Sequence, residues 1–392
     1  MFIAGVRGSC AREIAYLRGH PWDLALISWF PALLMALTWA IFAQGINIKL
    51  PIALVDEDHS PGSRRLAIAL EAARATAIAE RPVTLEAAWP LVRELKAYAV
   101  LHVPADWERR AQRGDRLPVV LYTNEQFHAA ATSIKTDVVG AIRSVAGGKA
   151  VDSLAALGGG FAGAERRAGV VRVELRTLYG PQLSFERALA GAFLPALLHL
   201  FVLAGAAYAI GREFRDGTAA AWLASAQGSM PAALLGKLLP LVLFSSALGL
   251  GSIAWMAGYR GWTASGSVLV WSLGLLTLVI ACCAIPALLL GLTGALRTVL
   301  SFLGIVNSTA ISFTGFTYPL FSMTTAAKVW SSILPFVYFY EIQQQQWNSG
   351  APLAASAAPF AVLWGAFIAV PLVVGAPLLS KLCQTPEKWG KR

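Results

Sequence analysis

Charged residues are scarce in this chain of 392 residues: only 14% are Asp, Glu, Lys or Arg, whereas 56% are hydrophobic. Soluble domains carry roughly 25% charged residues, so this composition excludes an ordinary soluble protein. Several charge-free stretches exceed the roughly 20 residues that a helix needs to cross a bilayer. We therefore expect an α-helical integral membrane protein with six transmembrane helices, drawn from residues 24–48, 188–211, 238–259, 261–296, 298–327 and 342–380.

Cysteine is also rare. Two of the four cysteines, Cys282 and Cys283, lie in a predicted span, and the other two, Cys10 and Cys383, lie in predicted cytoplasmic segments. None lies in the polar segment between the first two spans, so no disulfide framework is expected.

Catalytic signatures are missing as well. The nearest approaches to a phosphate-binding P-loop, Gly147-Gly148-Lys149 and Gly236-Lys237, lack both the upstream glycine and the Ser or Thr after the lysine. There is no His-Glu-x-x-His and no Gly-x-Ser-x-Gly. Asp56-Glu57-Asp58-His59 resembles a metal-ligand run, but a solvated loop after a strand is the favoured interpretation. We expect no enzyme activity, metal or cofactor in this chain.

Basic residues predict the orientation. With six spans, Arg7, Arg12 and Arg18, the basic residues at 212, 215, 237 and 297, and those at the C-terminus all fall on one side. The positive-inside rule makes that side cytoplasmic, with both termini inside. Residues 1–23 are then a cytoplasmic amphipathic helix, 24–48 a retained anchor rather than a signal peptide, and 382–392 a cytoplasmic tail. The net charge of +10 mostly reflects this bias, so we expect no nucleic-acid partner.

The polar segment 49–186 is long enough for a soluble domain, and its place between the first two spans predicts an extracytoplasmic location. Strands are predicted at 51–56, 97–103 and 117–122, with a return strand at 170–175 after a flexible Gly158-Gly159-Gly160 joint. Helices are predicted at 63–80, 85–95, 105–112 and 125–146. This alternation favours a small α/β domain, in which no catalytic constellation is visible.

Four charges crowd the short segment after the second span, Arg212-Glu213-Phe214-Arg215-Asp216. One interpretation is a solvated helix end. The other is a loop that receives force from a partner: Gly217 breaks the helix, Thr218 or Asp216 caps a short helix over 219–226, and Trp222 and Leu223 anchor it in the membrane interface. Glu213, Arg215 and Asp216 would then meet the partner. Spacing alone leaves the two interpretations equal.

Ile210-Gly211-Arg212-Glu213 with Gly217-Thr218 resembles the loop between the second and third spans of type-2 ABC exporter permeases. The chain departs from that family at Ala220 and Ala221, where an acidic residue is usual. The resemblance implies a cytoplasmic coupling loop, residues 211–226, that contacts an ABC ATPase. Its ATPase-coupling residues would be Arg212, Glu213, Phe214, Arg215, Asp216, Gly217, Thr218 and Trp222.

Two further stretches are similar to the same family in the same order. The run 312–319, followed by Ile333-Leu334-Pro335-Phe336 and Tyr340-Glu341, resembles its late signature. This implies an outer re-entrant segment at 319–341, marked by Gly315, Pro319, Pro335 and Glu341, in which Pro319 ends a helix and 323–330 form a half-helix. The stretches 52–64 and 99–109 resemble the large extracytoplasmic insertion of one branch of these permeases.

Polar residues form a stripe in the fifth predicted span: Asn307, Ser308, Thr309, Ser312 and Thr314. They either line a substrate path or hydrogen-bond neighbouring helices, and the two alternatives are equal. His199 lies in the second span, where a packing role is favoured over proton transfer.

The resemblance implies the membrane subunit of an ATP-driven exporter for a hydrophobic or amphipathic substrate, in a bacterial inner membrane. Its partners would be ABC ATPase subunits carrying ATP and Mg, a second or sister permease, membrane lipids and a periplasmic adaptor protein. The alternative is a non-transporting membrane receptor or scaffold with an extracytoplasmic sensor domain.

Overall fold

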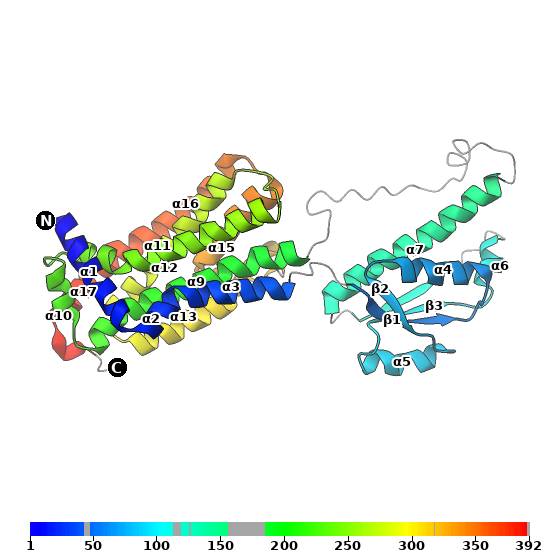
Figure 1. Ribbon diagram of the computed structural model, residues 1–392, viewed down its shortest axis with the longest axis horizontal. Coiled ribbons are helices and arrows are strands. Elements are labelled where there is room, and N and C mark those ends of the chain that lie inside the picture. Colours follow the sequence, from blue (N-terminus) through cyan, green and yellow to red (C-terminus); the bar gives the residue numbers. More distant parts are fainter. Residues whose placement is uncertain (43–47, 113–118, 125–126, 156–184, 317, 390–392) are drawn as a thin grey trace. The chain divides into compact units, whose positions relative to one another are not determined.

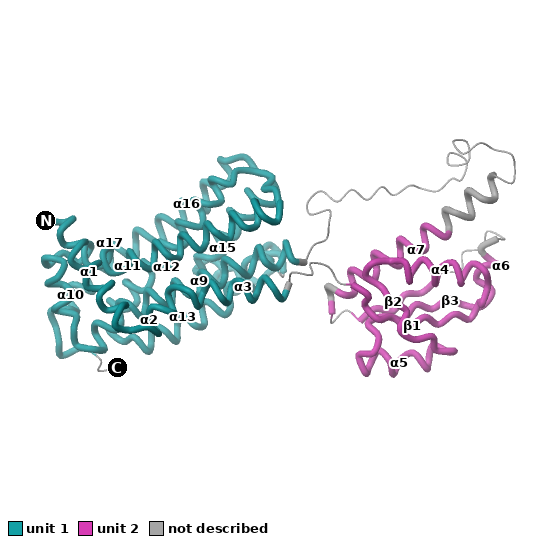
Figure 2. The backbone as a smooth tube through the Cα atoms, in the orientation of Figure 1, with its two compact units in different colours: residues 1–43, 178–392 teal, residues 44–177 magenta. Residues whose placement is uncertain are grey.

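A computed structural model describes residues 1–42, 48–112, 119–124, 127–155, 185–316 and 318–389. The chain divides into two compact units, one of residues 1–43 with 178–392 and the other of residues 44–177 (Figure 2). The predicted joint at 158–160 and the predicted strand at 170–175 lie outside the described residues.

The unit of residues 44–177 is built on a four-stranded sheet with the strand order β2-β1-β3-β4. Its strands are β1 (Leu50–Asp56), β2 (Thr76–Glu80), β3 (Ala99–Val103) and β4 (Val120–Thr123). The central strand β1 is parallel to both of its neighbours, whereas β4 is antiparallel to β3. Parallel strands need crossover connections, and helices supply them here.

Successive side chains of β1 point to opposite faces of the sheet, and both faces are covered by helices. Ile52 and Leu54 are buried with residues of α4 (Pro61–Ala72) and α7 (His128–Ala155) on one face. Ala53 and Val55 are buried against α5 (Leu85–Arg93) on the other. Figure 1 shows these helices on opposite sides of the sheet, with α6 (Trp107–Gln112) near one end. The result is an α/β sandwich.

Most secondary-structure predictions for this unit are confirmed, and one is wrong. Residues 76–80 are a strand, although the alanine-rich segment 63–80 predicted one continuous helix. Helix α4 ends at Ala72, and the backbone N–H of Leu50 then donates to the carbonyl of Ala75. Pairing with β1 gives backbone hydrogen bonds that outweigh the weak helix preference of this segment.

The other unit is helical. Its α-helices are α1 (Phe2–Gly19), α2 (Pro21–Ile27), α3 (Trp29–Phe42), α9 (Phe185–Arg215), α10 (Ala219–Ser225), α11 (Met230–Ala254), α12 (Val268–Thr293), α13 (Leu296–Ala310), α14 (Thr325–Ser332), α15 (Pro335–Gln343), α16 (Ala357–Val362) and α17 (Val370–Cys383). The described residues of this unit include three π-helical turns, η2 (Trp255–Tyr259), η4 (Gln344–Ser349) and η6 (Leu363–Ala369). Short 3₁₀ turns are η3 (Leu320–Ser322), η5 (Leu353–Ser356) and η7 (Pro386–Lys388).

Four helical stretches in the described residues are long and apolar enough to cross a membrane: 186–215, 230–259, 268–293 and 353–383. The pair α2 and α3, bent by 44°, gives a fifth if it counts as one span. The predicted fifth span at 298–327 is different, because α13 ends at Ala310 and is followed by turns. The count of six therefore stays a prediction.

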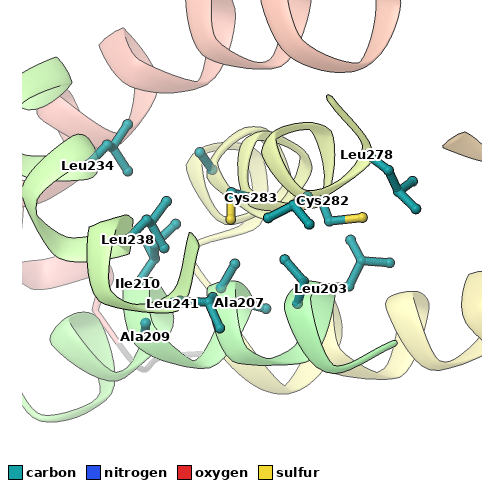
Figure 3. Close-up of a cluster of buried hydrophobic side chains, with 14 of the residues drawn as sticks. Leu203, Ala207, Ala209, Ile210, Leu234, Leu238, Leu241, Leu278, Cys282 and Cys283 are labelled. Carbon is teal, nitrogen blue, oxygen red and sulfur yellow. The ribbon is translucent and has the colours of Figure 1, made fainter. Parts of the chain in front are cut away.

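Helix α12 is at the centre of this unit. It packs against α9, α11, α15 and α17. Cys282 and Cys283 of α12 are buried and face α9, close to Leu203 and Ala207 (Figure 3). Such interfaces in a bilayer are held by van der Waals packing, because lipid is as apolar as the side chains.

Candidate functional site

Helix α9 ends in a tight turn that leads directly into α10. The N–H of Asp216 donates to the carbonyl of Arg212 at 2.8 Å, and the N–H of Thr218 donates to that of Glu213 at 2.8 Å. Between them Gly217 has φ = +72°, a left-handed conformation that glycine adopts without a steric penalty. The predicted helix break and the predicted short helix are confirmed, with α10 beginning at Ala219.

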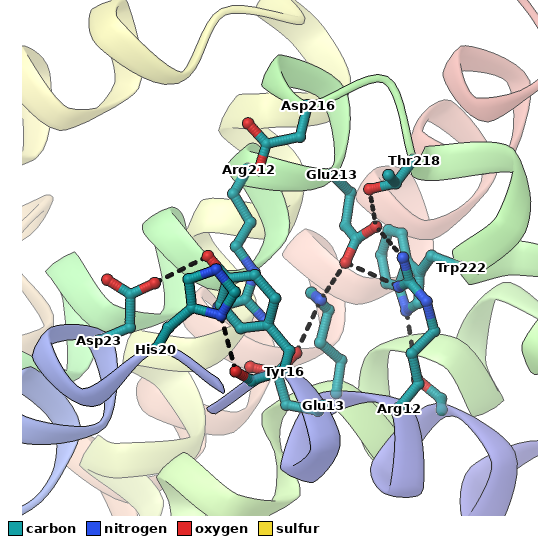
Figure 4. Close-up of polar contacts among 12 residues, drawn as sticks. Arg12, Glu13, Tyr16, His20, Asp23, Arg212, Glu213, Asp216, Thr218 and Trp222 are labelled. Carbon is teal, nitrogen blue, oxygen red and sulfur yellow. Dashed lines mark hydrogen bonds and ion pairs between the residues drawn. The ribbon is translucent and has the colours of Figure 1, made fainter. Parts of the chain in front are cut away.

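Five charged side chains, Arg12, Glu13, Arg212, Glu213 and Lys237, meet beside this turn and are named here the charge cluster (Figure 4). The guanidinium of Arg12 donates to both carboxylate oxygens of Glu213, at 2.8 and 2.9 Å. Lys237 Nζ donates to Glu213 Oε1 at 2.6 Å and to Glu13 Oε2 at 2.9 Å. Arg212 pairs with Glu13. The cluster thereby joins α1, α9 and α11.

The charge cluster is buried. Glu13, Arg212, Glu213 and Lys237 are each at most 4% exposed, whereas the side chain of Arg12 is 30% exposed. Three cations face two carboxylates, so each carboxylate is shared between two cations. Removing one partner from such a group leaves an uncompensated buried charge, which costs about 3–5 kcal/mol in other proteins. The geometry therefore fixes how these helices pack.

Two aromatic rings cover the charge cluster. The Arg212 guanidinium lies 3.6 Å from the ring centroid of Tyr16, and Lys237 Nζ lies 5.4 Å from that of Trp222. Tyr16 donates its hydroxyl to Asp23 at 2.8 Å. Burial, together with this hydrogen bond, raises the pKa of Tyr16 well above its ordinary value. The phenol therefore stays neutral and keeps its proton, with which it donates the hydrogen bond to the Asp23 carboxylate.

Helix α10 is tied to the same group through Thr218 and Trp222. Thr218 precedes α10 but makes no side-chain cap to it, and instead donates its hydroxyl to Glu213 Oε2 at 2.6 Å. Trp222 Nε1 lies 3.2 Å from Ser9 Oγ, to which it donates. Trp222 is fully buried and Leu223 is 9% exposed. The prediction that both anchor α10 in the membrane interface is therefore wrong, because both are buried within the protein and Trp222 bonds to α1 and α11.

Helix α1 is fitted closely to α10. A Cβ added at Gly8 would run into the backbone carbonyl oxygen of Ser225, so only glycine permits this approach. The buried residues of α1 recur at every fourth position, at Gly5, Ser9, Glu13 and Leu17. Arg12, Glu13 and Lys237 were not predicted as members of the site. One signal in the sequence could have indicated Glu13: it is an acidic residue at a position of α1 where the helix pattern, with one buried residue in every four, predicts burial.

The remaining residues of the predicted coupling loop divide into buried and exposed. Glu213 is enclosed in the charge cluster and does not face outward to meet a partner, contrary to the prediction. Phe214 is 3% exposed and packs edge-on against Trp389, with 6.3 Å between ring centroids. Arg215 and Asp216 are exposed, and they pair with each other at 2.7 Å.

The predicted polar stripe does not form one surface, and two of its members, Ser312 and Thr314, lie beyond the end of α13 at Ala310. Asn307 Oδ1 lies 3.0 Å from His199 Nδ1, and Thr309 Oγ1 accepts from Trp330 Nε1 at 3.0 Å. These two residues bond to other helices, as the second of the two alternatives requires. Thr314 is buried and bonds the backbone, whereas Ser308 and Ser312 are exposed.

The predicted re-entrant segment contains a short helix, α14, as expected, but the chain turns earlier than predicted. Helix α13 ends at Ala310, and Gly315 has φ = +86°, so Pro319 does not end a helix. Pro335 is the first residue of α15, where a missing N–H costs nothing. Glu341 is exposed and accepts from Gln345 at 3.2 Å.

A further buried carboxylate, which was not predicted as part of a site, lies at the other end of α9. Glu186 is 2% exposed; it accepts from Arg260 at 2.5 Å and from Trp39 Nε1 at 2.9 Å. This group, named here the Glu186 pair, joins α3 and the loop after η2 to the start of α9.

Among the residues that the structure describes, no group of three or more His, Cys, Asp or Glu side chains is placed to hold a metal ion. Asp56 Oδ1 accepts from the N–H groups of Asp58 and His59, at 3.1 and 3.0 Å. This is a turn that follows β1, as the favoured interpretation of that run expects.

Comparison with protein families identifies the chain. The family model described as "ABC-2 family transporter protein" matches residues 21–376. The match spans every candidate membrane helix up to residue 376 and includes the turn between α9 and α10, while α1 precedes it. A comparison with curated proteins found no similar sequence. The chain therefore belongs to the ABC-2 transporter family and is a multi-pass membrane permease of that kind.

Proposed function

We propose that this permease is the membrane subunit of an ATP-driven exporter and that α10, with α1, receives force from a separate ABC ATPase. The observation that carries the proposal is the charge cluster, which ties α10 and α1 to α9 and α11. A surface helix that is linked to two long helices through buried ion pairs can pass a displacement on to them. Loop motion does not then absorb the displacement. The family membership gives no support to the receptor alternative.

In the proposed mechanism, two ATPase subunits bind ATP and Mg and close. They press on the exposed Arg215–Asp216 pair and on α10 and α1. Because Glu213 is held by Arg12 and Lys237 at once, α1, α9 and α11 move as one body. The apolar helices then reorient, and a hydrophobic or amphipathic substrate leaves the cytoplasm or the inner membrane.

The same proposal sets topology and partners. Both termini are cytoplasmic in a bacterial inner membrane, and the unit of residues 44–177 is extracytoplasmic, where it meets substrate or a periplasmic adaptor. A second permease copy, or a sister permease, completes the transporter. Exposed Gly304 and Ser308, one turn apart on α13, provide a face of small residues suited to close packing with that copy.

The test is charge reversal at the exposed part of the loop. Arg215→Glu should leave expression and the melting temperature in detergent nearly unchanged, because an exposed ion pair contributes about 0–1 kcal/mol. It should abolish copurification with the ABC ATPase and the stimulation of its ATP hydrolysis. Lys381→Glu, a reversal at an exposed residue near the end of α17, is the matched control. Undiminished ATPase association with Arg215→Glu, or with residues 212–223 deleted, would refute the coupling role.

A further inference from the structure

A cavity of about 200 Å³ lies among α9, α12, α13, α15 and the last span, away from the charge cluster. All twelve residues that line it are apolar. Its deep wall includes Leu203, Leu303 and Val306, which are 1%, 4% and 6% exposed. Phe302 and Ile333 line it too and are 42% and 47% exposed. The cavity therefore runs from the surface of the bundle into its interior.

One wall of the cavity is a π-helical turn. Ala366 and Phe367, both lining residues, belong to η6, which interrupts the last candidate span. A π-bulge inside a membrane helix is rare and is frequently found at functional sites. Pro371, in the first turn of α17 directly after η6, also lines the cavity. The widened turn is thus part of what makes room between this span and α13.

The chemistry of the cavity limits what can occupy it. Water needs two to four polar partners, and the side chains that line the cavity offer none. Apolar cavities of similar size stay dry and bind apolar molecules. Leu203 lies about midway along α9, a candidate membrane span, so the cavity lies at bilayer depth. An empty apolar cavity also loses dispersion contacts along its whole wall. A hydrocarbon chain therefore fits the cavity chemically, and the surrounding bilayer supplies such chains.

We propose that this cavity is a binding site for one hydrocarbon chain of a bilayer lipid, inserted between α13 and η6. The site lies within one chain, behind α13, and needs neither ATP nor the ATPase. It stands independently of the proposed export function, since chain binding is measured without transport.

The test is photolabelling of the full-length protein in lipid nanodiscs, with phosphatidylglycerol that carries a diazirine in the middle of one acyl chain. Labelled peptides are mapped by mass spectrometry. We expect labels on α13 near 302–306 and on η6. Ala366→Phe, which fills the cavity from an exposed position, should lower this labelling roughly tenfold, the change that a loss of about 1.4 kcal/mol in affinity produces. Ala361→Phe, at an exposed alanine of the same span that does not line the cavity, should leave it unchanged.

Ile333→Trp is a second filling variant, on the opposite side of the mouth, in case Ala366→Phe does not fold; melting curves in detergent report folding for each. Labelling that persists in folded filling variants would overturn the proposal, as would labels spread evenly over exposed surfaces such as α3. Crosslinks from a probe at 302 to a second copy, without lipid labels, would assign the cavity to that copy instead.

Discussion

The two ends of α9 are both joined to neighbouring elements through buried carboxylates, but the number of ion pairs differs. At its start, the Glu186 pair sets one carboxylate against one guanidinium that is one-third exposed, with an indole N–H as the second donor. At its end, the charge cluster sets two carboxylates against three cations, and four of the five groups are nearly sealed from solvent. At the start of α9, one carboxylate with two donors joins the elements. At its end, a network of shared ion pairs does so.

This difference indicates where the permease is rigid. In the charge cluster, Glu213 is held by Arg12, Lys237 and Thr218 together, so no single rotamer change frees α10. At the Glu186 pair, Arg260 can move into solvent while Trp39 keeps its hydrogen bond. We expect the end of α9 beside α10 to move as a block, and the other end to adjust locally.

The largest effect is expected for Glu213→Gln. This change leaves three buried or half-buried cations facing one carboxylate, so the free energy of unfolding should fall by about 3–5 kcal/mol. Thermal unfolding in detergent measures it. Glu387→Gln, at an exposed residue in η7, is the matched control and should stay within about 0.5 kcal/mol. Equal melting temperatures for the two variants would contradict the role given to the cluster.

Lys237→Met should cost less than Glu213→Gln, although Lys237 is equally buried. Removing the lysine leaves Arg12 and Arg212 opposite Glu13 and Glu213, so the charges balance. A double-mutant cycle with Glu13→Gln measures the coupling between Lys237 and Glu13, which we expect at about 0.5–3 kcal/mol. Strict additivity in the cycle would show that the two residues do not interact as described.

A smaller effect is expected at the Glu186 pair. Arg260→Ala removes a partly exposed donor, while the buried carboxylate keeps its bond from Trp39, so the loss should be about 1–3 kcal/mol. Combining Arg260→Ala with Trp39→Phe should exceed the sum of the single changes, because Glu186 then has neither donor. If Arg260→Ala lowered the free energy of unfolding as much as Glu213→Gln does, the two ends of α9 would not differ in the way described.

The smallest expected effect is a shift in the pKa of the Cys10 thiol in α1. Burial, and secondarily the negative charge of Glu13, raises the pKa of the Cys10 thiol. The thiolate is the reactive form, so Cys10 should be alkylated slowly near neutral pH. Glu13→Gln removes a charge that disfavours the thiolate, so the inflection of the rate of iodoacetamide alkylation should move to lower pH. The other three cysteines are buried and should give little background.

Local signals in the sequence were enough for several elements. Gly217 predicted the end of α9, since only a left-handed residue allows the turn into α10, and the apolar segment 51–56 predicted a strand, which is confirmed as β1. The segment 76–80 was misread because its alanines favour a helix locally, whereas the edge of β1 offers hydrogen bonds that only the folded sheet provides. The turn after Ala310 was likewise hidden in a continuous apolar run.

The sequence by itself determined that this is a membrane protein, where four of its long apolar helices lie, and which segment carries the features of an ABC-2 permease, because length, hydropathy and turn residues are local properties. The tertiary structure decided which charges meet. Glu13, Glu213 and Lys237 come from three helices far apart in the chain, and their burial, like that of Trp222, follows from how α1 packs on α10 and α11. Burial and pairing are properties of contacts between distant segments, and no local pattern specifies them.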